Sequence, residues 1–208
     1  MLQKQMKKYI TDVLESIESQ QGLHKLKLFK EEKDYAEKHK LIPADIMKNI
    51  TLVEEDALSR FTDAIIERCN KETEELIAKE GPDFLHHPIT ILNKKKDEFV
   101  YMESKWFHII DADAISIEAD DVFEIYSVML GLKVQKKYHD LIKSYFENNL
   151  QGQEVKFNIL FNHDDGLWNV NFALDYIDGF KEDFSIGEAY GLLYQFLFTL
   201  VDTIEEVK

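Results

Sequence analysis

The chain has 208 residues, and its hydrophobic fraction of 45%, with 12% aromatic residues, excludes a disordered chain. The net charge of −15 disfavours binding to nucleic acid, because phosphate-backbone binding relies on Lys and Arg to displace counterions. Cys69 alone cannot form an internal disulfide framework, and the longest uncharged apolar run, residues 189–201, is shorter than the ~20 residues that span a bilayer. A soluble cytoplasmic protein without membrane contact is therefore expected.

The first 49 residues predict short elements. Apolar residues at helical spacing indicate an amphipathic helix over residues 2–18. Leu26 and Leu28 indicate a short strand, and residues 30–39 a charged helix. Pro43 suits the first turn of a further short helix over residues 44–49.

A long helix is predicted over residues 51–81, because Thr51 and Glu54 have the spacing of a capping box and Gly81-Pro82 ends the run. Its apolar side would carry Leu58, Phe61, Ile65, Cys69 and Leu76. On such a helix Cys69 is a small buried hydrophobic residue rather than a reactive thiol.

Residues 88–110 fit two patterns. As strands they would be Ile89–Leu92 and Glu98–Met102, joined by a lysine-rich turn. As a helix they place most apolar residues on one half of the helical wheel, and this interpretation is preferred. Residues 119–149 are predicted to continue as one or two helices, interrupted near Gly131 and ending before Gly152.

Residues 155–175 contain the clearest pattern, a β-hairpin. Val155, Phe157, Ile159 and Phe161 alternate with less apolar residues, and Trp168, Val170, Phe172 and Leu174 repeat this period after the turn at residues 163–166. The turn sets a register that pairs Phe161 with Trp168, Ile159 with Val170 and Phe157 with Phe172.

A capping box of Ser185 and Glu188 predicts the start of the last helix, which ends near Ile204. This helix is apolar nearly all round and is expected to be central and buried, with Gly187 and Gly191 facing a close neighbour such as the hairpin. The predicted fold class is α+β, predominantly helical, with a C-terminal antiparallel β-hairpin packed on this buried helix. One domain over residues 1–208 is expected; the alternative divides it into a helical part, 1–81, and an α+β part, 82–208.

Acidic residues are concentrated in two zones. Residues 97–128 contain nine acids against Lys105 alone, and residues 162–188 contain seven against Lys181 alone. Such surfaces attract a basic protein or a cation, although solubility alone is the simpler explanation. The predicted partner-binding acids are Asp111, Asp113, Glu118, Asp120 and Asp121.

Three asparagines lie on the second face of the predicted hairpin: Asn158, Asn169 and Asn171, with Asn158 opposite Asn171. Asparagine is depleted in strands, so this group is a candidate for recognition of a partner backbone or a polar ligand. A solvated face is the simpler alternative.

The segment Glu118-Ala119-Asp120-Asp121 resembles the helix-borne Glu-x-x-Asp of all-α nucleotide pyrophosphohydrolases. That resemblance implies binding of Mg²⁺ or Mn²⁺ by Glu118 and Asp121, with Glu72, Glu75 or Asp113 as further candidate ligands. The paired upstream glutamates of the family have no counterpart at the expected spacing. The ordinary alternative is that these acids favour the N-terminus of a helix.

Common catalytic signatures are missing from the sequence: it contains no G-x-G-x-x-G, no P-loop, no G-x-S-x-G and no H-E-x-x-H. For His86, His87 and His163, loop and turn roles are preferred over metal binding. The sequence therefore predicts a non-catalytic module that binds a basic protein, as an inhibitor or immunity-type protein does. The alternative is a divalent-metal-dependent hydrolase of phosphoesters or nucleotides, and a third hypothesis is an accessory domain of a homo-oligomer.

Overall fold

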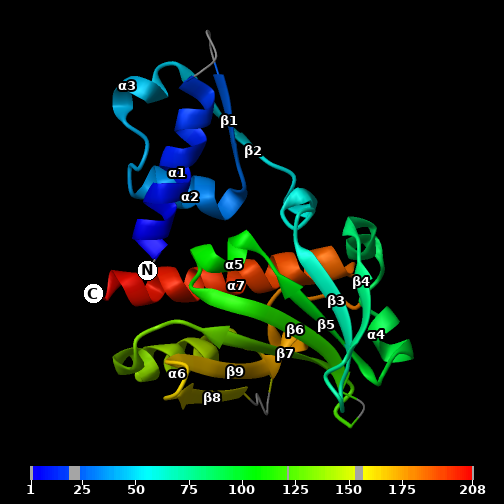
Figure 1. The fold of residues 1–208 in the computed structure, drawn as a ribbon. Helices are drawn as coiled ribbons and strands as arrows, with labels where there is room; N and C mark the ends of the chain where they lie inside the picture. The colour runs from blue at the N-terminus through cyan, green and yellow to red at the C-terminus, as the bar shows by residue number, and fades with distance from the viewer. Residues whose placement is uncertain (1, 19–23, 121, 153–156, 208) are drawn as a thin grey trace.

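A computed structural model describes residues 2–18, 24–120, 122–152 and 157–207 (Figure 1). The first part of the described chain forms α1 (Leu2–Glu18), β1 (His24–Leu28), α2 (Lys30–Lys38), α3 (Ala44–Met47), β2 (Ile50–Glu54), η1 (Ala57–Ser59), β3 (Ile65–Asn70), β4 (Leu76–Glu80), η2 (Pro82–His86) and α4 (Ile91–Lys94). The rest forms β5 (Glu98–Glu103), α5 (Lys105–Ile109), β6 (Ala112–Asp120), β7 (Ile125–Leu132), η3 (Lys136–Tyr138), α6 (His139–Asn149), β8 (Phe157–Asn162), β9 (Leu167–Ala173), η4 (Leu174–Tyr176) and α7 (Ile186–Glu206).

The fold is α+β, as predicted, but it is not predominantly helical, and the hairpin is part of a larger sheet. Seven antiparallel strands pair in the order β4-β3-β5-β6-β7-β9-β8. The long helix α7 runs across one face of this sheet (Figure 1). We call the sheet and α4 to α7 the body. The N-terminal lobe comprises α1, β1, α2, α3 and β2, in which β1 and β2 pair in parallel.

The inner face of the sheet is apolar because the register brings apolar residues into rows. One row places Val100, Ile117, Val128, Phe172 and Phe157 opposite one another across β5, β6, β7, β9 and β8. Tyr190 of α7 is fully buried against this face, and its hydroxyl donates to the carbonyl oxygens of Val100 and Ile115 at 3.0 and 3.2 Å. These hydrogen bonds satisfy a polar group that would otherwise be costly to bury.

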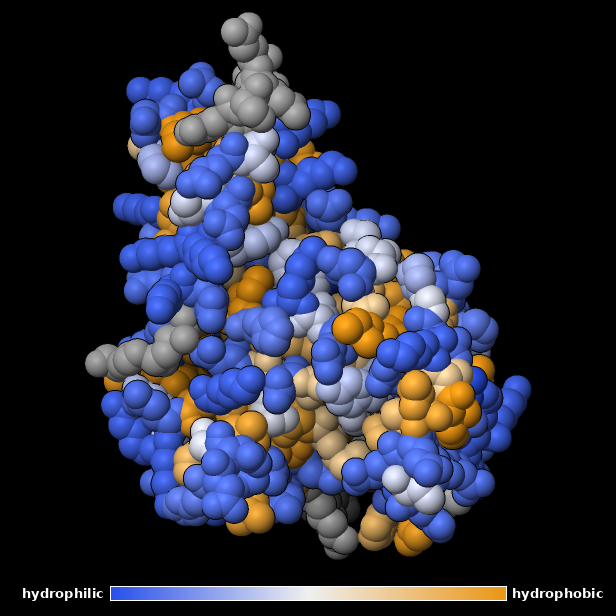
Figure 2. Space-filling model, viewed as in Figure 1, coloured by the Kyte–Doolittle hydropathy of each residue, from blue (hydrophilic) through white to orange (hydrophobic). Residues whose placement is uncertain are grey.

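The outer face of the sheet is more polar and more accessible than the inner face. Its central row across the same five strands is Tyr101, Ser116, Met129, Asn171 and Asn158. Figure 2 shows the molecule from the side seen in Figure 1; hydrophilic residues cover most of it, and hydrophobic residues form small separate groups. The alternation of apolar and polar residues along the strands thus separates a buried face from an accessible one.

The hairpin prediction is confirmed. In the structure Phe161 pairs with Trp168, Ile159 with Val170 and Phe157 with Phe172. Val155 lies outside the described residues, and Leu174, predicted on the second strand, instead begins η4. The helices over residues 2–18, 30–39 and 44–49 and the strand at Leu26 and Leu28 are also confirmed, with ends that differ by one or two residues.

The last helix begins with the predicted capping box, in which Ser185 accepts from the backbone N–H of Glu188 and the Glu188 carboxylate accepts from that of Ser185. The predicted close neighbour of Gly187 exists, but it is the carbonyl oxygen of Leu85 in η2, 3.2 Å from where a Cβ would lie, and not the hairpin. Gly191 has no such neighbour within 4 Å among the described residues. None of the helices in the described part of the chain, α7 included, is long and apolar enough to cross a membrane.

The long helix predicted over residues 51–81 is wrong, because this segment forms β2, η1, β3 and β4. Thr51 and Glu54 belong to β2 and make no capping box. The hydrogen bonds of β3 go to β4 and β5, and such non-local pairing overrides a local helical pattern. Cys69 is nevertheless buried, as predicted, on a strand. Gly81 lies in the chain between β3 and β5, and these two strands are hydrogen-bonded to each other.

The helix preferred for residues 88–110 is wrong in its centre, where the alternative strand Glu98–Met102 forms β5. Ile89–Leu92 is not a strand, because α4 begins at Ile91. Over residues 119–149 the helical prediction holds only for α6, since residues 125–132 form β7. Buried and half-buried residues alternate along β7, a period of two that its sequence also shows at Tyr126, Val128, Leu130 and Leu132.

Arg60 joins the N-terminal lobe to the body. It is 3% exposed, and its guanidinium donates to the two carboxylate oxygens of the fully buried Glu32 at 2.6 and 3.0 Å. The rings of Phe29, Tyr194 and Trp106 lie 4.2, 4.0 and 5.0 Å from the guanidinium carbon. Ion pairing and cation–π contacts thus compensate the desolvation of both charges.

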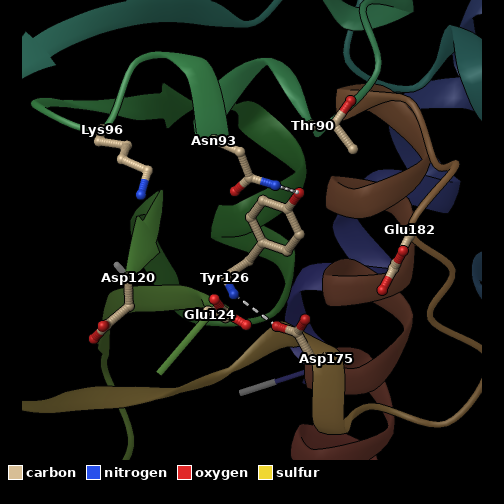
Figure 3. A pocket seen from close by; sticks show the side chains of 8 residues that line it. All are labelled: Thr90, Asn93, Lys96, Asp120, Glu124, Tyr126, Asp175 and Glu182. Atoms are coloured by element: carbon tan, nitrogen blue, oxygen red, sulfur yellow. Dashed lines mark hydrogen bonds between the residues drawn. The ribbon is translucent and has the colours of Figure 1, made fainter. Parts of the chain in front are cut away.

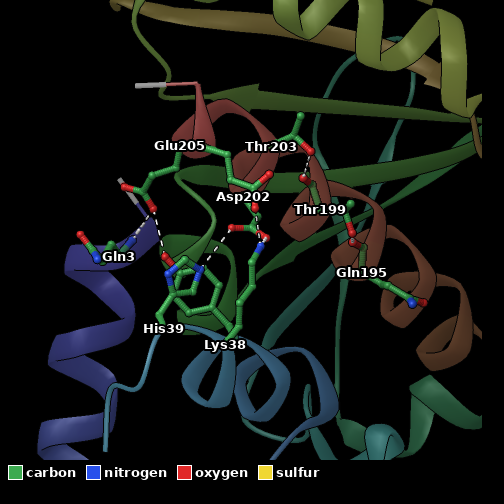
Figure 4. A network of polar contacts seen from close by, with 10 residues as sticks. Gln3, Lys38, His39, Gln195, Thr199, Asp202, Thr203 and Glu205 are labelled. Carbon is green, nitrogen blue, oxygen red and sulfur yellow. Dashed lines mark hydrogen bonds and ion pairs between the residues drawn. The ribbon is translucent and has the colours of Figure 1, made fainter.

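A second set of contacts, nearer the surface, attaches the lobe to the C-terminal turns of α7 (Figure 4). The backbone N–H of Gln3 and the hydroxyl of Tyr35 donate to Glu205 at 2.7 and 3.2 Å. Lys38 contacts Asp202 at 2.9 Å and also Glu206. The first turn of α1 and the last turns of α7 therefore lie side by side.

Candidate functional site

The strongest candidate site is a cavity of about 350 Å³ at one end of the sheet, which we call the acidic pocket (Figure 3). Its residues come from α4 and its flanks, the end of β6 and the turn that follows it, the start of β7, η4 and the segment before α7. Four of them are carboxylates and one is a lysine: the lining is Thr90, Asn93, Lys96, Asp120, Glu124, Tyr126, Asp175 and Glu182. Its formal charge is therefore negative, and its size falls within the usual range of ligand sites.

Asp175 and Tyr126 form the wall of the acidic pocket. The backbone N–H of Tyr126 donates to Asp175 Oδ2 at 2.7 Å, and the Tyr126 hydroxyl accepts from Asn93 Nδ2 at 2.9 Å (Figure 3). Burial raises the pKa of the Asp175 carboxyl, the hydrogen bond from Tyr126 partly opposes this, and Glu182 raises it further. A cation entering the pocket would relieve this cost of holding a charged carboxylate.

The raised pKa of Asp175 predicts a pH-dependent contribution to stability. Because the folded-state pKa lies above the unfolded one, this contribution is present at low pH and is lost as pH rises through the folded-state pKa. Asp175→Asn is therefore expected to raise the free energy of unfolding at neutral pH relative to the native chain, but not at acidic pH. Urea unfolding at both pH values measures the difference, with Asp140→Asn, a 97%-exposed carboxylate, as the control. A difference independent of pH would contradict the prediction.

Two of the pocket carboxylates, Asp120 and Glu124, lie at the end of β6 and in the turn that follows it. Asp120 Oδ1 accepts from the backbone N–H groups of Val122 and Phe123 at 2.8 and 3.0 Å. Glu124 has a φ of 54°, in the left-handed region that costs an L-residue roughly 1–2 kcal/mol. Strain of this kind recurs at functional sites.

The five acids predicted to bind a partner do not form one cluster. Asp120 lines the acidic pocket. Asp113, more than half exposed, forms an ion pair with Lys133 at 3.2 Å. Asp111 has a φ of 54° and precedes β6, whereas Asp121 lies outside the described residues. Glu118 projects from the outer face, 3.9 Å from Lys71 Nζ, and burial raises its pKa while Lys71 lowers it in part.

The three hairpin asparagines do share the outer face, and Asn158 lies opposite Asn171, as predicted. Together with Ser116 and Met129 they line a shallow cavity of about 430 Å³. Asn171 Oδ1 accepts from the Ser127 hydroxyl at 3.1 Å, and all three asparagines are exposed. Their donors and acceptors remain accessible to a ligand.

The helix predicted to carry the Glu-x-x-Asp pair is wrong, because Glu118 lies on strand β6. The helical spacing that would place Glu118 and Asp121 on one face is therefore absent at Glu118, and Asp121 lies outside the described residues. Glu72 and Glu75 lie in the turn after β3, where Asn70 accepts from two backbone N–H groups. Among the residues that the structure describes, no group of three or more His, Cys, Asp or Glu is arranged to hold a metal ion.

His86, His87 and His163 lie at a helix end or in a turn, as expected. His86 ends η2, and His87 Nδ1 lies 3.3 Å from the carbonyl oxygen of Phe84. His163 lies in the hairpin turn, with Nε2 3.1 Å from Lys136 Nζ.

Sequence reasoning missed all of the acidic pocket except Asp120, namely Thr90, Asn93, Lys96, Glu124, Tyr126, Asp175 and Glu182. The two acidic zones were the available signal, because Glu124 belongs to the first and Asp175 and Glu182 to the second, but nothing local connects the two zones with each other. Comparisons with protein-family models, with curated proteins and with solved structures gave no match for this chain.

Proposed function

We propose that the protein is a non-catalytic interaction module that binds a basic group of a partner protein in the acidic pocket. The observation that carries this proposal is the convergence of Asp120, Glu124, Asp175 and Glu182 on one cavity, whose described lining includes one lysine, Lys96. An arginine or lysine side chain would place its charge among these carboxylates. An inhibitor or immunity-type protein with a basic target would act in this way.

The chain between Asp120 and Glu124 adds an apolar element. Val122 and Phe123 are 82% and 60% exposed in the turn that also carries Asp120 and Glu124. Large exposed apolar side chains beside a polar cavity are typical of protein-binding surfaces. A partner segment with a basic residue next to an apolar one matches both features.

The experiment uses a short Arg-Gly repeat peptide as probe and follows backbone amide shifts by NMR. The Tyr126 amide is the expected reporter, because it donates directly to Asp175. The double variant Asp175→Asn/Glu182→Gln is expected to weaken binding at least about tenfold, or 1.4 kcal/mol, and binding should also weaken with salt.

Asp140→Asn is the matched control, because Asp140 on α6 is not part of the acidic pocket. It should leave the affinity for the peptide unchanged. Equal losses in the two variants, or shifts spread evenly over all acidic surfaces, would mean that the peptide responds only to net charge, and the proposal would then fail.

Glu124→Gly is expected to change stability and binding in opposite directions. Glycine adopts the left-handed conformation without steric cost, so the free energy of unfolding should rise by roughly 0.5–1 kcal/mol, while the loss of a carboxylate weakens peptide binding. Glu74→Gly is the matched control, because Glu74 has a φ of 58° in the turn between β3 and β4, outside the pocket. It should gain similar stability and keep its affinity. Weakened binding in both variants would contradict a specific role for Glu124.

A further inference from the structure

The two edges of the seven-stranded sheet differ in their protection. The β4 edge carries Lys79 and Glu80, has a register shift opposite Arg68, and is followed by Gly81-Pro82. On the inner side, Arg68 donates to Glu80 at 2.6 Å and also pairs with Glu98. Charges, irregular pairing and a nearby proline are the devices by which natural sheets prevent further strand addition.

The β8 edge has none of these devices within residues 157–162. Its sequence, Phe-Asn-Ile-Leu-Phe-Asn, contains no charged residue and no proline, and its pairing with β9 is continuous. Leu160 is 61% exposed. Among the described strands β8 has one neighbour only, and Figure 1 shows it at the free side of the sheet. One row of its backbone N–H and C=O groups therefore faces away from the sheet.

The inner apolar layer is also incomplete at this edge. On β9, Trp168, Val170 and Phe172 are 1–3% exposed. Their partners on β8, Phe161, Ile159 and Phe157, are only partly buried. At the β4 edge, by contrast, the inner layer ends with the ion pair between Arg68 and Glu80. The β8 edge thus leaves both hydrogen-bonding groups and apolar area for another strand to cover.

We propose that β8 pairs in antiparallel fashion with β8 of a second copy of this chain, so that the two sheets become continuous. Opposite residues in an antiparallel pair lie on the same face, so a register centred on Leu160 is self-complementary. It places Leu160 opposite Leu160 of the second copy, Asn158 opposite Asn162, and Ile159 opposite Phe161. Apolar residues then continue along the inner face, and like residues pair on the outer face.

Charge favours a second copy over a basic partner at this edge. Residues 157–162 carry no acid with which a basic strand would pair. Each copy has a net charge of −15, so the contact should lie on a neutral strand, and salt should strengthen it by screening the repulsion. The acidic pocket, by contrast, should lose its basic ligand as salt rises. The two interactions are therefore distinguishable.

The first test is the solution mass measured by sedimentation equilibrium over a range of protein and salt concentrations. A mass that rises with concentration and salt toward twice 24.5 kDa is expected. Leu160→Lys should restore 24.5 kDa, because it places two like charges at the centre of the contact. Leu76→Lys is the matched control: Leu76 is 50% exposed on the β4 edge, and this change should leave the dimer intact. A monomer under all conditions, or equal loss in both variants, would overturn the proposal.

The second test identifies the register by disulfide cross-linking with diamide, which accepts the electrons and protons of the two thiols. Leu160→Cys should cross-link rapidly, because directly opposite Cα atoms lie about 4.5–5.5 Å apart, within disulfide reach. Asn158→Cys is the control on the same strand and face; the two copies of residue 158 would be about 13 Å apart, out of reach. The native Cys69 is buried. Equal rates for both variants would indicate random collision and overturn the pairing.

Discussion

Replacement of Arg60 by alanine is expected to lower the free energy of unfolding by about 3–5 kcal/mol, because it leaves the carboxylate of Glu32 buried without its cation. The variant also loses the contacts of the guanidinium with Phe29 and Tyr194. Arg60 joins the N-terminal lobe to the body, so unfolding of the lobe should be the first consequence. Urea unfolding followed by tryptophan fluorescence reports on this junction, since Trp106 lies 5.0 Å from Arg60.

Two variants separate the buried charge from other effects of this substitution. The double variant Arg60→Met/Glu32→Gln removes the Arg60–Glu32 ion pair and keeps an acceptor for the Tyr194 hydroxyl, and of the two carboxylates that Arg60 contacts it leaves only Glu31, which is 18% exposed. It should therefore be more stable than Arg60→Ala, which also leaves the fully buried Glu32 charged. Lys133→Ala breaks an ion pair in which both side chains are about half exposed, and it should cost less than about 1 kcal/mol. A loss for Arg60→Ala no greater than that of Lys133→Ala would show that the buried pair contributes little.

Phe172→Ala is expected to destabilise the protein by about 3–5 kcal/mol, because Phe172 is 1% exposed and its removal leaves a cavity between β9, α6 and α7. Its ring centroid lies 5.1 Å from that of Phe146 and 5.6 Å from that of Phe196. Phe157 lies directly opposite Phe172 and also contacts Phe146, at 5.4 Å.

Phe157→Ala is therefore the matched control, and it should cost roughly half as much or less, because Phe157 is only partly buried on the edge strand. Thermal and urea unfolding at low protein concentration compare the two variants without a contribution from association. Equal losses would mean that the aromatic layer is already complete at β8, against the arrangement described above.

Some of the fold could be predicted because its signals are local. The hairpin register follows from the period of two at residues 157–161 and 168–172 and from the turn length between them. The start of α7 follows from hydrogen bonds between Ser185 and Glu188, three residues apart. The apolar circumference of α7 predicted its burial, and twelve of its residues are buried.

The failed helices over residues 51–81 and 88–110 share a physical cause. Residues 65–70 and 98–103 form strands because each supplies hydrogen-bond partners to the other, with residues 115–118 completing the pairing on β6. Paired residues lie 28 to 38 positions apart between β3 and β5 and 13 to 19 apart between β5 and β6, so the pattern within one short segment does not reveal the pairing. For residues 125–132 the cause is different, because the period of two is present in the sequence itself and a strand is predictable from it.

The sequence by itself determined the α+β class, the hairpin with its asparagine face, the buried last helix and the acidic character of the chain, because periodicity, capping and charge are properties of neighbouring residues. Tertiary structure alone decided the seven-strand order, the burial of Arg60 against Glu32, the free β8 edge and the acidic pocket. That pocket joins residues 90–96 with Asp120, Asp175 and Glu182, which become neighbours only when the sheet has formed and α7 has packed across it.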